Sequence, residues 1–381
     1  MKFIVSKLAL EEAVKNLSRV INSKNALPIL GDILFEVNAE EKSVLLTASD
    51  SEVWLQYTLI IDDCDGSGRF AVGNKRLADM LKGIPEQPVT IEVNTDESRF
   101  AINYDCGYAY FSTDNADEYP TPLADPKNFK QAVVKSDDLR TAIDRCLFAA
   151  AHDDLRPIMN GICLDFDGNS FNAVASDGHV IMLSTHDANV GEAMECMIPR
   201  KVCAVMAKAL KPATETYLMA EDRLCSIEQE NMVLKFRFIE GKYVAYKKVI
   251  PDTQAHCVIV ERKALMDALR AVIPFTNDSS NMIAFDFEGD NKLFVTGRDY
   301  DLSLGASRDL PAENYNGTEL ISIGLKGSTL LNVLGKISGS KVSINFDAPD
   351  RAVVIKPHAA DGDDEEEAKM LGLMMPMLLN D

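Results

Sequence analysis

Asp177 and His179, separated by one glycine, are the side chains whose types and spacing come closest to a catalytic arrangement. The stretch around them reads VASDGHVIML, from Val174 to Leu183. A carboxylate beside an imidazole is the arrangement of a general acid–base pair. Asp-Gly is equally a preferred pair for a tight hairpin turn, in which the aspartate bonds to the backbone instead of to a substrate. The sequence therefore raises two alternatives, an active site and a turn.

The motifs that usually accompany catalysis are absent from the sequence. No serine or cysteine nucleophile stands at a suitable spacing beside His179. The chain has neither a G-x-x-x-x-G-K-[ST] nor a G-x-G-x-x-G phosphate-binding motif. Its 8 cysteines are scattered singly, without a C-x-x-C pair, which predicts reduced and mostly buried thiols in a cytoplasmic protein. We therefore expect no catalytic residue, no metal site and no cofactor, and we interpret His179 as the wall of a pocket or a satisfied polar group.

The elements that position this pair belong to an internal repeat. Three predicted helix starts share an apolar residue followed five positions later by leucine and then by x-x-Ala-apolar, and their leucines are Leu10, Leu139 and Leu265. The turn itself recurs, because TASDSEVWLQ, VASDGHVIML and VTGRDYDLSL follow the three starts in order. A second helix start recurs in FAVGNKRLADMLKGIP, CMIPRKVCAVMAKALK and ISIGLKGSTLLNVLGK. All three markers agree on a period of about 127 residues, as a repeat architecture requires.

The period predicts three similar domains of the α+β class, at residues 1–127, 128–253 and 254–381. Each has two amphipathic helices packed on antiparallel sheet, since helical leucine spacing alternates with hairpin patterns. The linkers YPTPLADPKN and PDTQAH carry proline and polar residues. No run of about 18 apolar residues is present, and the N-terminus lacks the features of a signal peptide, so no membrane partner is expected.

The charge of the chain is uneven. The net charge is −20, which on its own argues against nucleic acid. Basic residues nevertheless concentrate on the predicted helices, whereas acidic residues gather in loops and strands such as EVNAEEK and DGDDEEE. One positive face would bind phosphates without regard to sequence. The alternative is ordinary solvated helix faces, which composition alone favours.

The sequence resembles a known family along its whole length. The resemblance lies in ALPILGDILFEV (residues 26–37), LRPIMNGICLDF (155–166), ASDGHVIML (175–183), IPRK (198–201) and MMPMLL (374–379). These stretches resemble the β subunit of bacterial DNA polymerase III, a family of sliding clamps that confer processivity. The resemblance implies that two chains join head to tail into a closed ring of six domains. Basic helices would line the hole around double-stranded DNA, and the ring would be opened by a separate loader ATPase.

The resemblance also implies which residues contact DNA and which bind partner peptides. The DNA-contacting candidates are basic residues in helix starts and loops: Lys24, Lys75, Arg76, Arg156, Arg200 and Lys201. Some relatives have aromatic residues where this chain has Pro157 and Ile158. The pocket candidates are Met159, Ser176, Gly178, His179, Val180, Ile181, Val244, Lys248, Val249, Leu373, Met375, Pro376, Met377 and Leu379. In the family this pocket receives short apolar motifs from the replicative polymerase alpha subunit, the clamp loader, other DNA polymerases and repair proteins.

The chain departs from the family pattern at several pocket positions. Val180 and Leu378 replace residues that are commonly basic, Val244 replaces a common proline, and Lys248 stands at a frequent arginine position. A more apolar pocket is therefore expected. Without the resemblance, MMPMLL would be interpreted as a core-facing final strand.

For ring closure, Tyr110 and Phe111 of one chain are expected to face Ile273, Pro274 and Phe275 of the other. The run DGDDEEEAK, residues 361–369, is expected to be a disordered acidic loop. The alternative function is a peptide-binding scaffold that does not encircle DNA.

Overall fold

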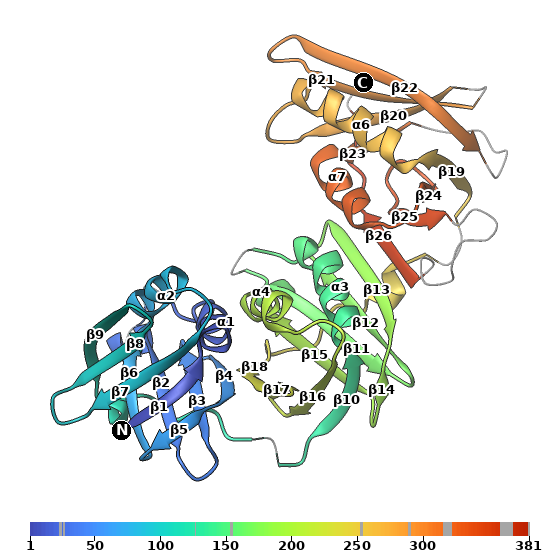
Figure 1. Ribbon diagram of the computed structural model, residues 1–381. Coiled ribbons are helices and arrows are strands. Elements are labelled where there is room, and N and C mark those ends of the chain that lie inside the picture. The colour runs from blue at the N-terminus through green and yellow to red at the C-terminus, as the bar shows by residue number, and fades with distance from the viewer. Residues whose placement is uncertain are drawn as a thin grey trace. The chain divides into compact units, whose positions relative to one another are not determined.

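The fold of the chain comes from a computed structural model, which describes residues 1–22, 25, 27–125, 127–152, 155–251, 254–288, 291–314, 322–358 and 369–379. These residues pack into two compact units. Figure 1 labels their helices and strands. Unit 1 holds Met1–Asp137, Asn189–Glu192 and Lys201–Phe238, and unit 2 holds Asp138–Ala188, Ala193–Arg200 and Ile239–Asp381. The expected acidic loop lies outside the described residues, apart from Lys369.

The six long helices follow the predicted repeat. The first helix of each repeat has 11 residues: α1 (Lys7–Leu17), α3 (Ser136–Cys146) and α6 (Arg262–Val272). The second has 10 residues: α2 (Asn74–Gly83), α4 (Arg200–Ala209) and α7 (Gly327–Lys336). The repeated leucines Leu10, Leu139 and Leu265 are all buried, which confirms that they mark the core faces of the first helices. The shorter helical segments are η1 (Pro28–Gly31), η2 (Ala116–Glu118), η3 (Leu147–Ala149), η4 (Pro157–Met159), α5 (Tyr246–Val249) and η5 (Ile273–Phe275).

Helix starts in the first and third repeats have side-chain caps. The Ser6 hydroxyl accepts a hydrogen bond of 3.4 Å from the backbone N–H of Ala9 at the start of α1. The Glu261 carboxylate does the same for Ala264 at 3.2 Å in α6. Each cap satisfies one of the backbone donors that a helix start leaves without a partner.

Unit 1 is built on one sheet of 14 antiparallel strands, in the order β14-β10-β16-β17-β18-β4-β3-β2-β6-β9-β8-β7-β1-β5. Its strands are β1 (Lys2–Ser6), β2 (Asp32–Asn38), β3 (Ser43–Ser49), β4 (Val53–Ile60), β5 (Asp62–Asp65), β6 (Gly68–Gly73), β7 (Pro88–Asn94), β8 (Arg99–Tyr104), β9 (Gly107–Asp114), β10 (Lys130–Lys135), β14 (Asn189–Val190), β16 (Glu215–Glu221), β17 (Leu224–Gln229) and β18 (Met232–Arg237).

Unit 2 is built on a sheet of 12 strands, in the order β15-β11-β12-β13-β26-β25-β24-β19-β22-β21-β20-β23. Its strands are β11 (Gly161–Asp167), β12 (Ser170–Ser176), β13 (Val180–Asp187), β15 (Met194–Pro199), β19 (His256–Glu261), β20 (Met282–Glu288), β21 (Lys292–Asp299), β22 (Leu304–Asn314), β23 (Ile323–Lys326), β24 (Lys341–Phe346), β25 (Val353–His358) and β26 (Met370–Met374).

The second repeat contributes strands to both sheets. In unit 1, β18 of the second repeat pairs with β4 of the first, with Leu234 opposite Leu55. In unit 2, β13 of the second repeat pairs with β26 of the third, with Ile181 opposite Leu373. Sheet hydrogen bonding therefore continues from one repeat into the next in each unit, and these two strand pairs join the repeats.

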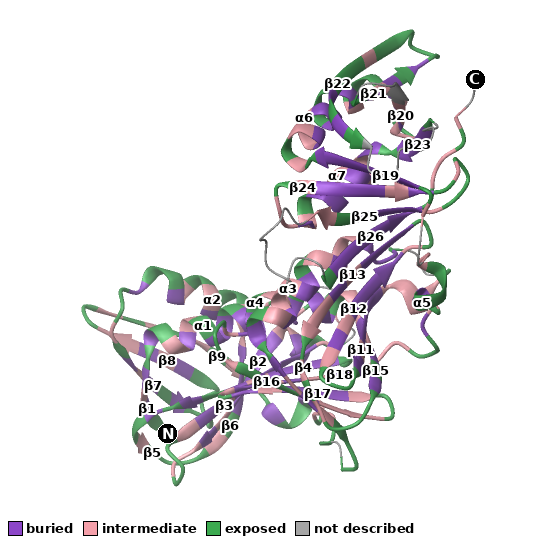
Figure 2. Cartoon of the chain, turned by 90° about the vertical axis from the view of Figure 1, so that its right-hand side faces the viewer, coloured by how far each residue is buried: buried purple, intermediate pink, exposed green. Residues whose placement is uncertain are grey.

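The cores are apolar and closely packed. In unit 1, Phe35 stacks on Phe70 with ring centroids 5.0 Å apart, and Phe100 lies 5.9 Å from Phe35. In unit 2, β26 is buried along its whole length, as Figure 2 shows. A side chain at Gly372 would lie 2.5 Å from the Val333 side chain, so glycine lets α7 approach the strand closely. Only the first residue of MMPMLL, Met374, belongs to this core strand, and residues 375–379 continue beyond its end.

Most of the cysteines are buried, as expected from the sequence. The buried ones are Cys146, Cys163, Cys196, Cys203 and Cys225, and none of the 8 cysteines forms a disulfide in the structure. None of the helices in the described ranges combines the length and the apolarity that crossing a membrane requires.

Candidate functional site

The Asp177 carboxylate forms a turn instead of an acid–base pair. Its Oδ1 accepts hydrogen bonds from the backbone N–H groups of His179 and Val180, at 2.8 and 2.9 Å. The same two bonds recur at 3.1 and 2.9 Å at Asp50 and at 2.9 and 3.1 Å at Asp299. Because the bonds recur in all three repeats, the aspartate is a structural element of the repeat. The turn alternative is therefore confirmed.

The residue after the aspartate adopts a left-handed backbone conformation in two of the three turns. Gly178 has φ of 89°, and Ser51 has φ of 80° at the same place in the first repeat. Glycine adopts this conformation freely, whereas serine does so at a cost. A side chain at Gly178 would also lie 2.7 Å from the Arg156 guanidinium. The DGH motif therefore needs its glycine for both conformation and space.

The Asp177 turn stands at the junction of the second and third repeats. The His179 carbonyl accepts a hydrogen bond of 2.8 Å from the Met375 backbone N–H, just beyond the end of β26. The His179 side chain is exposed. Beside the β13–β26 pair lies one apolar cluster, whose buried members are Cys163, Val174, Ile181, Tyr243, Tyr246, Val354, Leu371 and Leu373.

The predicted pocket residues divide into a buried floor and an exposed rim. Ser176, Val180, Ile181 and Leu373 are buried. Val249 and Met375 keep 49% and 42% of their surface exposed, an unusual amount for apolar side chains beside a core. Gly178 and Lys248 are exposed, while Met159, Val244, Pro376, Met377 and Leu379 are half-buried. The replacements at Val180 and Leu378 have different consequences, since Val180 joins the floor and Leu378 is exposed.

The last residues of the chain return to the third repeat. The Met377 backbone N–H donates to the Gly324 carbonyl at 2.8 Å. A side chain at Gly324 would lie 2.4 Å from the Met377 carbonyl oxygen and 3.0 Å from the Leu379 side chain. The segment from Met375 to Leu379 is therefore held by backbone hydrogen bonds at Met375, to His179, and at Met377, to Gly324.

Two tyrosines of this site were missed by sequence reasoning. Tyr243 and Tyr246 are buried in the apolar cluster, and the Tyr246 hydroxyl donates to Asp165 Oδ2 at 2.6 Å. Burial and the Asp165 carboxylate raise the pKa of Tyr246, so the phenol stays protonated and donating. Lys247 Nζ lies 2.8 Å from the same oxygen. The motif YVAY, residues 243–246, with aromatic residues three apart just before the second linker, was the available signal.

Lys75 and Arg76 are exposed in the first turn of α2. A hollow of about 510 Å³ near the end of α1 is lined by Lys75 and Lys82, and also by Asp79, whose carboxylate pairs with Lys82 at 3.0 Å. Its polar lining residues include Ser18, Asn22, Asn25 and Asn74. Amides and ammonium groups around a hollow suit phosphate oxygens, as sequence-independent DNA contacts require. Lys24 lies outside the described residues.

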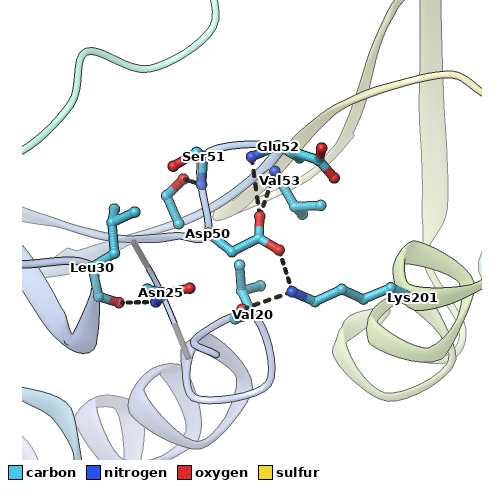
Figure 3. A network of polar contacts seen from close by, with 9 residues as sticks. Val20, Asn25, Leu30, Asp50, Ser51, Glu52, Val53 and Lys201 are labelled. Atoms are coloured by element: carbon cyan, nitrogen blue, oxygen red, sulfur yellow. Dashed lines mark hydrogen bonds and ion pairs between the residues drawn. The ribbon is translucent and has the colours of Figure 1, made fainter. Parts of the chain in front are cut away.

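The other basic candidates form hydrogen bonds within the protein. Figure 3 shows Lys201 Nζ between the Val20 carbonyl, at 3.2 Å, and the Asp50 carboxylate. Arg200 donates to the Leu147 carbonyl at 2.8 Å. Arg156 Nη1 donates to the Asp177 carbonyl, so it supports the turn at the pocket. Lys201 thus ties α4 of the second repeat to the aspartate turn of the first.

The predicted ring-closing residues lie on two different elements. Tyr110 and Phe111 stand on β9, where Phe111 stacks on Phe100 with ring centroids 5.2 Å apart and Tyr110 is exposed. Ile273, Pro274 and Phe275 form η5, in which Pro274 and Phe275 are exposed and Ile273 is half-buried. Both groups therefore offer apolar surface.

Three family models match consecutive parts of the chain. The N-terminal, central and C-terminal domains of the DNA polymerase III beta subunit match residues 1–123, 133–245 and 247–371. Among curated proteins, the "Beta sliding clamp" of Pseudomonas aeruginosa is 26% identical over 382 residues, covering 100% of both chains. The "Beta sliding clamp homolog GriR" of Streptomyces muensis is 26% identical over 384 residues, covering 99% of each.

Solved structures share the fold. The beta subunit of DNA polymerase III from Thermotoga maritima aligns with a TM-score of 0.89 at 22% identity, and that from Pseudomonas aeruginosa with 0.90 at 23%. Both alignments cover 100% of each chain. A Pseudomonas aeruginosa structure with griselimycin bound aligns equally well, with a TM-score of 0.90 at 23% identity.

Proposed function

Because this chain belongs to the family of the bacterial DNA polymerase III beta subunit, the beta sliding clamps, we propose that two copies form a closed ring around double-stranded DNA. The ring would join the first repeat of each copy to the third repeat of the other. Residues 1–127, 128–253 and 254–381 would be its three domains, so that a dimer supplies six. The observation that carries this proposal is the triplication of one fold unit, with matching helices and matching aspartate turns, along the whole chain.

Enclosure would hold the ring on DNA without a tight grip. Exposed cations such as Lys75 and Arg76 would contact phosphates weakly and without regard to base sequence, which permits sliding. The remaining surface of a chain with net charge −20 would repel DNA. A polymerase held on the ring gains a high effective concentration at the template. The protein would therefore act in the cytoplasm as a non-catalytic processivity subunit.

The apolar site at the junction of β13 and β26 would bind short linear motifs of partner proteins. Exposed Val249 and Met375 over a buried apolar floor suit the apolar tip of such a peptide. Methionine side chains adapt to different partners. The partners would be the replicative polymerase alpha subunit, the clamp loader, other DNA polymerases and repair proteins. The related Pseudomonas aeruginosa structure with griselimycin bound supports ligand binding by this fold.

Retention on DNA of different topology tests the proposal. The protein is loaded by a clamp loader onto nicked circular DNA, and the circle is then cut once. A ring stays on the circle and leaves the linear product through its free ends, whereas blocking both ends restores retention. Equal loss from blocked and free-ended DNA would contradict enclosure. Light scattering supplies the second readout, because the ring requires a mass near twice 41.9 kDa.

A peptide-binding scaffold that does not encircle DNA is the alternative. Reversing Lys75 and Arg76 to glutamate separates the two functions, since the change leaves the β13–β26 junction untouched. Processive synthesis should fall at physiological salt while peptide affinity stays the same. Unchanged processive synthesis would favour the scaffold.

A further inference from the structure

The short helix α5 presents part of the predicted pocket rim. Two of its 4 residues, Lys248 and Val249, are exposed and belong to the predicted peptide site. A helix of about one turn is not stable alone, because too few hydrogen bonds offset the order that they impose. Within the described residues, no side chain caps its start at Ala245. Contacts outside α5 must therefore hold the helix in place.

One carboxylate provides two such contacts. Asp165, on β11, accepts a hydrogen bond of 2.6 Å from the Tyr246 hydroxyl, and Lys247 Nζ lies 2.8 Å from the same oxygen. Tyr246 and Lys247 are the first two residues of α5, so both bonds hold the start of the helix against the strand. Lys247 Nζ also lies 5.6 Å from the centroid of the Tyr246 ring. The three side chains therefore form one cluster, which we call the Asp165 anchor.

The two bonds of the Asp165 anchor differ in strength. The Lys247 side chain is 60% exposed, and an exposed ion pair contributes little to stability because water and salt screen it. Tyr246 is buried, and a hydrogen bond from a hydroxyl to a carboxylate is one of the stronger kinds. Leaving that buried hydroxyl without a partner would be unfavourable. The hydroxyl of Tyr246 therefore contributes most of the stability of the anchor.

The Asp165 anchor is continuous with the pocket floor. The Tyr246 ring belongs to the same buried cluster as Ile181 and Leu373, which stand opposite each other on β13 and β26. Val244 and Ile250, which flank α5 in the sequence, pack against that cluster, and Figure 2 shows α5 beside β12 and β13. Apolar packing has no preferred direction, whereas a hydrogen bond does. The ring therefore seats α5 on the floor, and the hydroxyl fixes its position over β11.

We propose that Asp165 is a positioning residue of the peptide site. By binding Tyr246 and Lys247 it holds α5 in place, so that Lys248 and Val249 stand at the rim before a partner peptide arrives. This inference rests on the proposed function of the β13–β26 junction. A rim that is already formed binds more tightly, because binding then does not have to order the helix. Asp165 acts through α5 and does not touch the peptide.

Removing either partner of the hydrogen bond tests the inference. Tyr246→Phe removes the hydroxyl and keeps the buried ring, and Asp165→Ala removes the carboxylate. Each should raise the Kd of the full-length protein for a fluorescein-labelled peptide ending in leucine and phenylalanine about tenfold, as measured by anisotropy. The double variant should bind no more weakly than Asp165→Ala, since both changes remove the same bond. Lys247→Gln should have a smaller effect, because its ion pair is exposed.

Asp167→Ala is the matched control, because it removes an exposed carboxylate from the same face of β11. Its Kd should equal that of the unaltered protein. Hydrogen exchange then separates positioning from a general loss of stability. In Tyr246→Phe and Asp165→Ala, deuterium uptake at residues 246–250 should rise, and bound peptide should lower it again. Uptake in β26 should stay as it is in the unaltered protein.

Several results would overturn the inference. An unchanged Kd in Tyr246→Phe and Asp165→Ala would do so, as would an equal rise in Asp167→Ala. A raised Kd without faster exchange at residues 246–250 would mean that packing alone holds α5. Faster exchange in β26 as well would indicate a general loss of stability instead of a role in positioning. If the unaltered protein does not bind the peptide, the proposed peptide site itself is contradicted.

Discussion

The backbone carbonyl of His179 accepts a hydrogen bond from the backbone N–H of Met375, at 2.8 Å. His179, which the sequence offers as half of a possible acid–base pair, thus joins the second and third repeats through its backbone. The Asp177 turn sets the position of that carbonyl, because the carboxylate accepts hydrogen bonds from the N–H groups of His179 and Val180. The motif DGH is therefore a structural part of the junction between β13 and β26.

Asp177→Ala tests the link between the turn and the pocket. Removing a carboxylate that accepts two backbone hydrogen bonds should cost about 1 kcal/mol of stability. Since the same turn positions the pocket wall, the affinity for a fluorescent apolar-motif peptide should fall about fivefold, as measured by anisotropy. Asp299→Ala is the matched control, because it removes the same pair of bonds in the third repeat. Equal effects of both substitutions on peptide affinity would disprove the link.

Ser51→Gly should stabilise the protein. Ser51 adopts φ of 80°, a left-handed conformation that glycine adopts without strain. The relief of strain exceeds the added flexibility of the unfolded chain, so the expected gain is about 0.5 kcal/mol in urea unfolding. The reciprocal change, Gly178→Ala, should destabilise by about 1 kcal/mol or more, because it adds strain and crowds Arg156. A loss of stability in Ser51→Gly would contradict this account.

The basic candidates should separate into two groups by the salt dependence of DNA affinity. Replacing Lys75 and Arg76 by glutamine should reduce the slope of log affinity against log salt by about 2, since each phosphate contact contributes about 0.9. Lys201→Met should instead lower the stability of unit 1, because Asp50 loses its ion pair. Lys292→Gln, at an exposed lysine on β21, is the control for a general change of charge. A larger slope change in Lys201→Met than in the double variant would reverse the assignment.

Asp32 should make stability depend on pH near neutrality. Burial, then a hydrogen bond and repulsion from Asp114, raise its pKa from 3.8 to about 7. Between these values the folded chain binds more protons than the unfolded chain, so stability falls as pH rises and levels off above about 7. The slope is at most about 1.4 kcal/mol per pH unit. Asp32→Asn should therefore be more stable than the parent at pH 8, with a smaller difference at pH 5. Urea unfolding curves that differ equally at both pH values would refute this expectation.

Local patterns in the sequence predicted the helices and turns well. Leu10, Leu139 and Leu265 mark core faces because helical burial repeats within a few residues. The aspartate turns could also be predicted from the sequence, since their hydrogen bonds span only two or three residues. The three-domain fold follows from these local signals and their period.

The remaining features depend on distant partners. Lys201 looks like a DNA-facing lysine in the sequence, but its partner Asp50 stands 151 positions earlier. The division of the second repeat between two sheets depends on the pairs β18–β4 and β13–β26, which no local pattern encodes. Tyr246 joins the pocket floor through Asp165, 81 positions away. The roles of the pocket and DNA-facing residues came from the family resemblance and stay predictions.

The middle repeat contributes strands to both sheets, so its folding depends on both of its neighbours. Its strands β10, β14 and β16–β18 complete the sheet of the first repeat, and β11–β13 and β15 complete that of the third. Deleting the middle repeat would uncover β4 and β26 together. Excising it as a separate polypeptide would leave both of its halves without a neighbour. The three repeats are therefore similar in fold but not exchangeable, and unfolding of either sheet should involve the middle repeat.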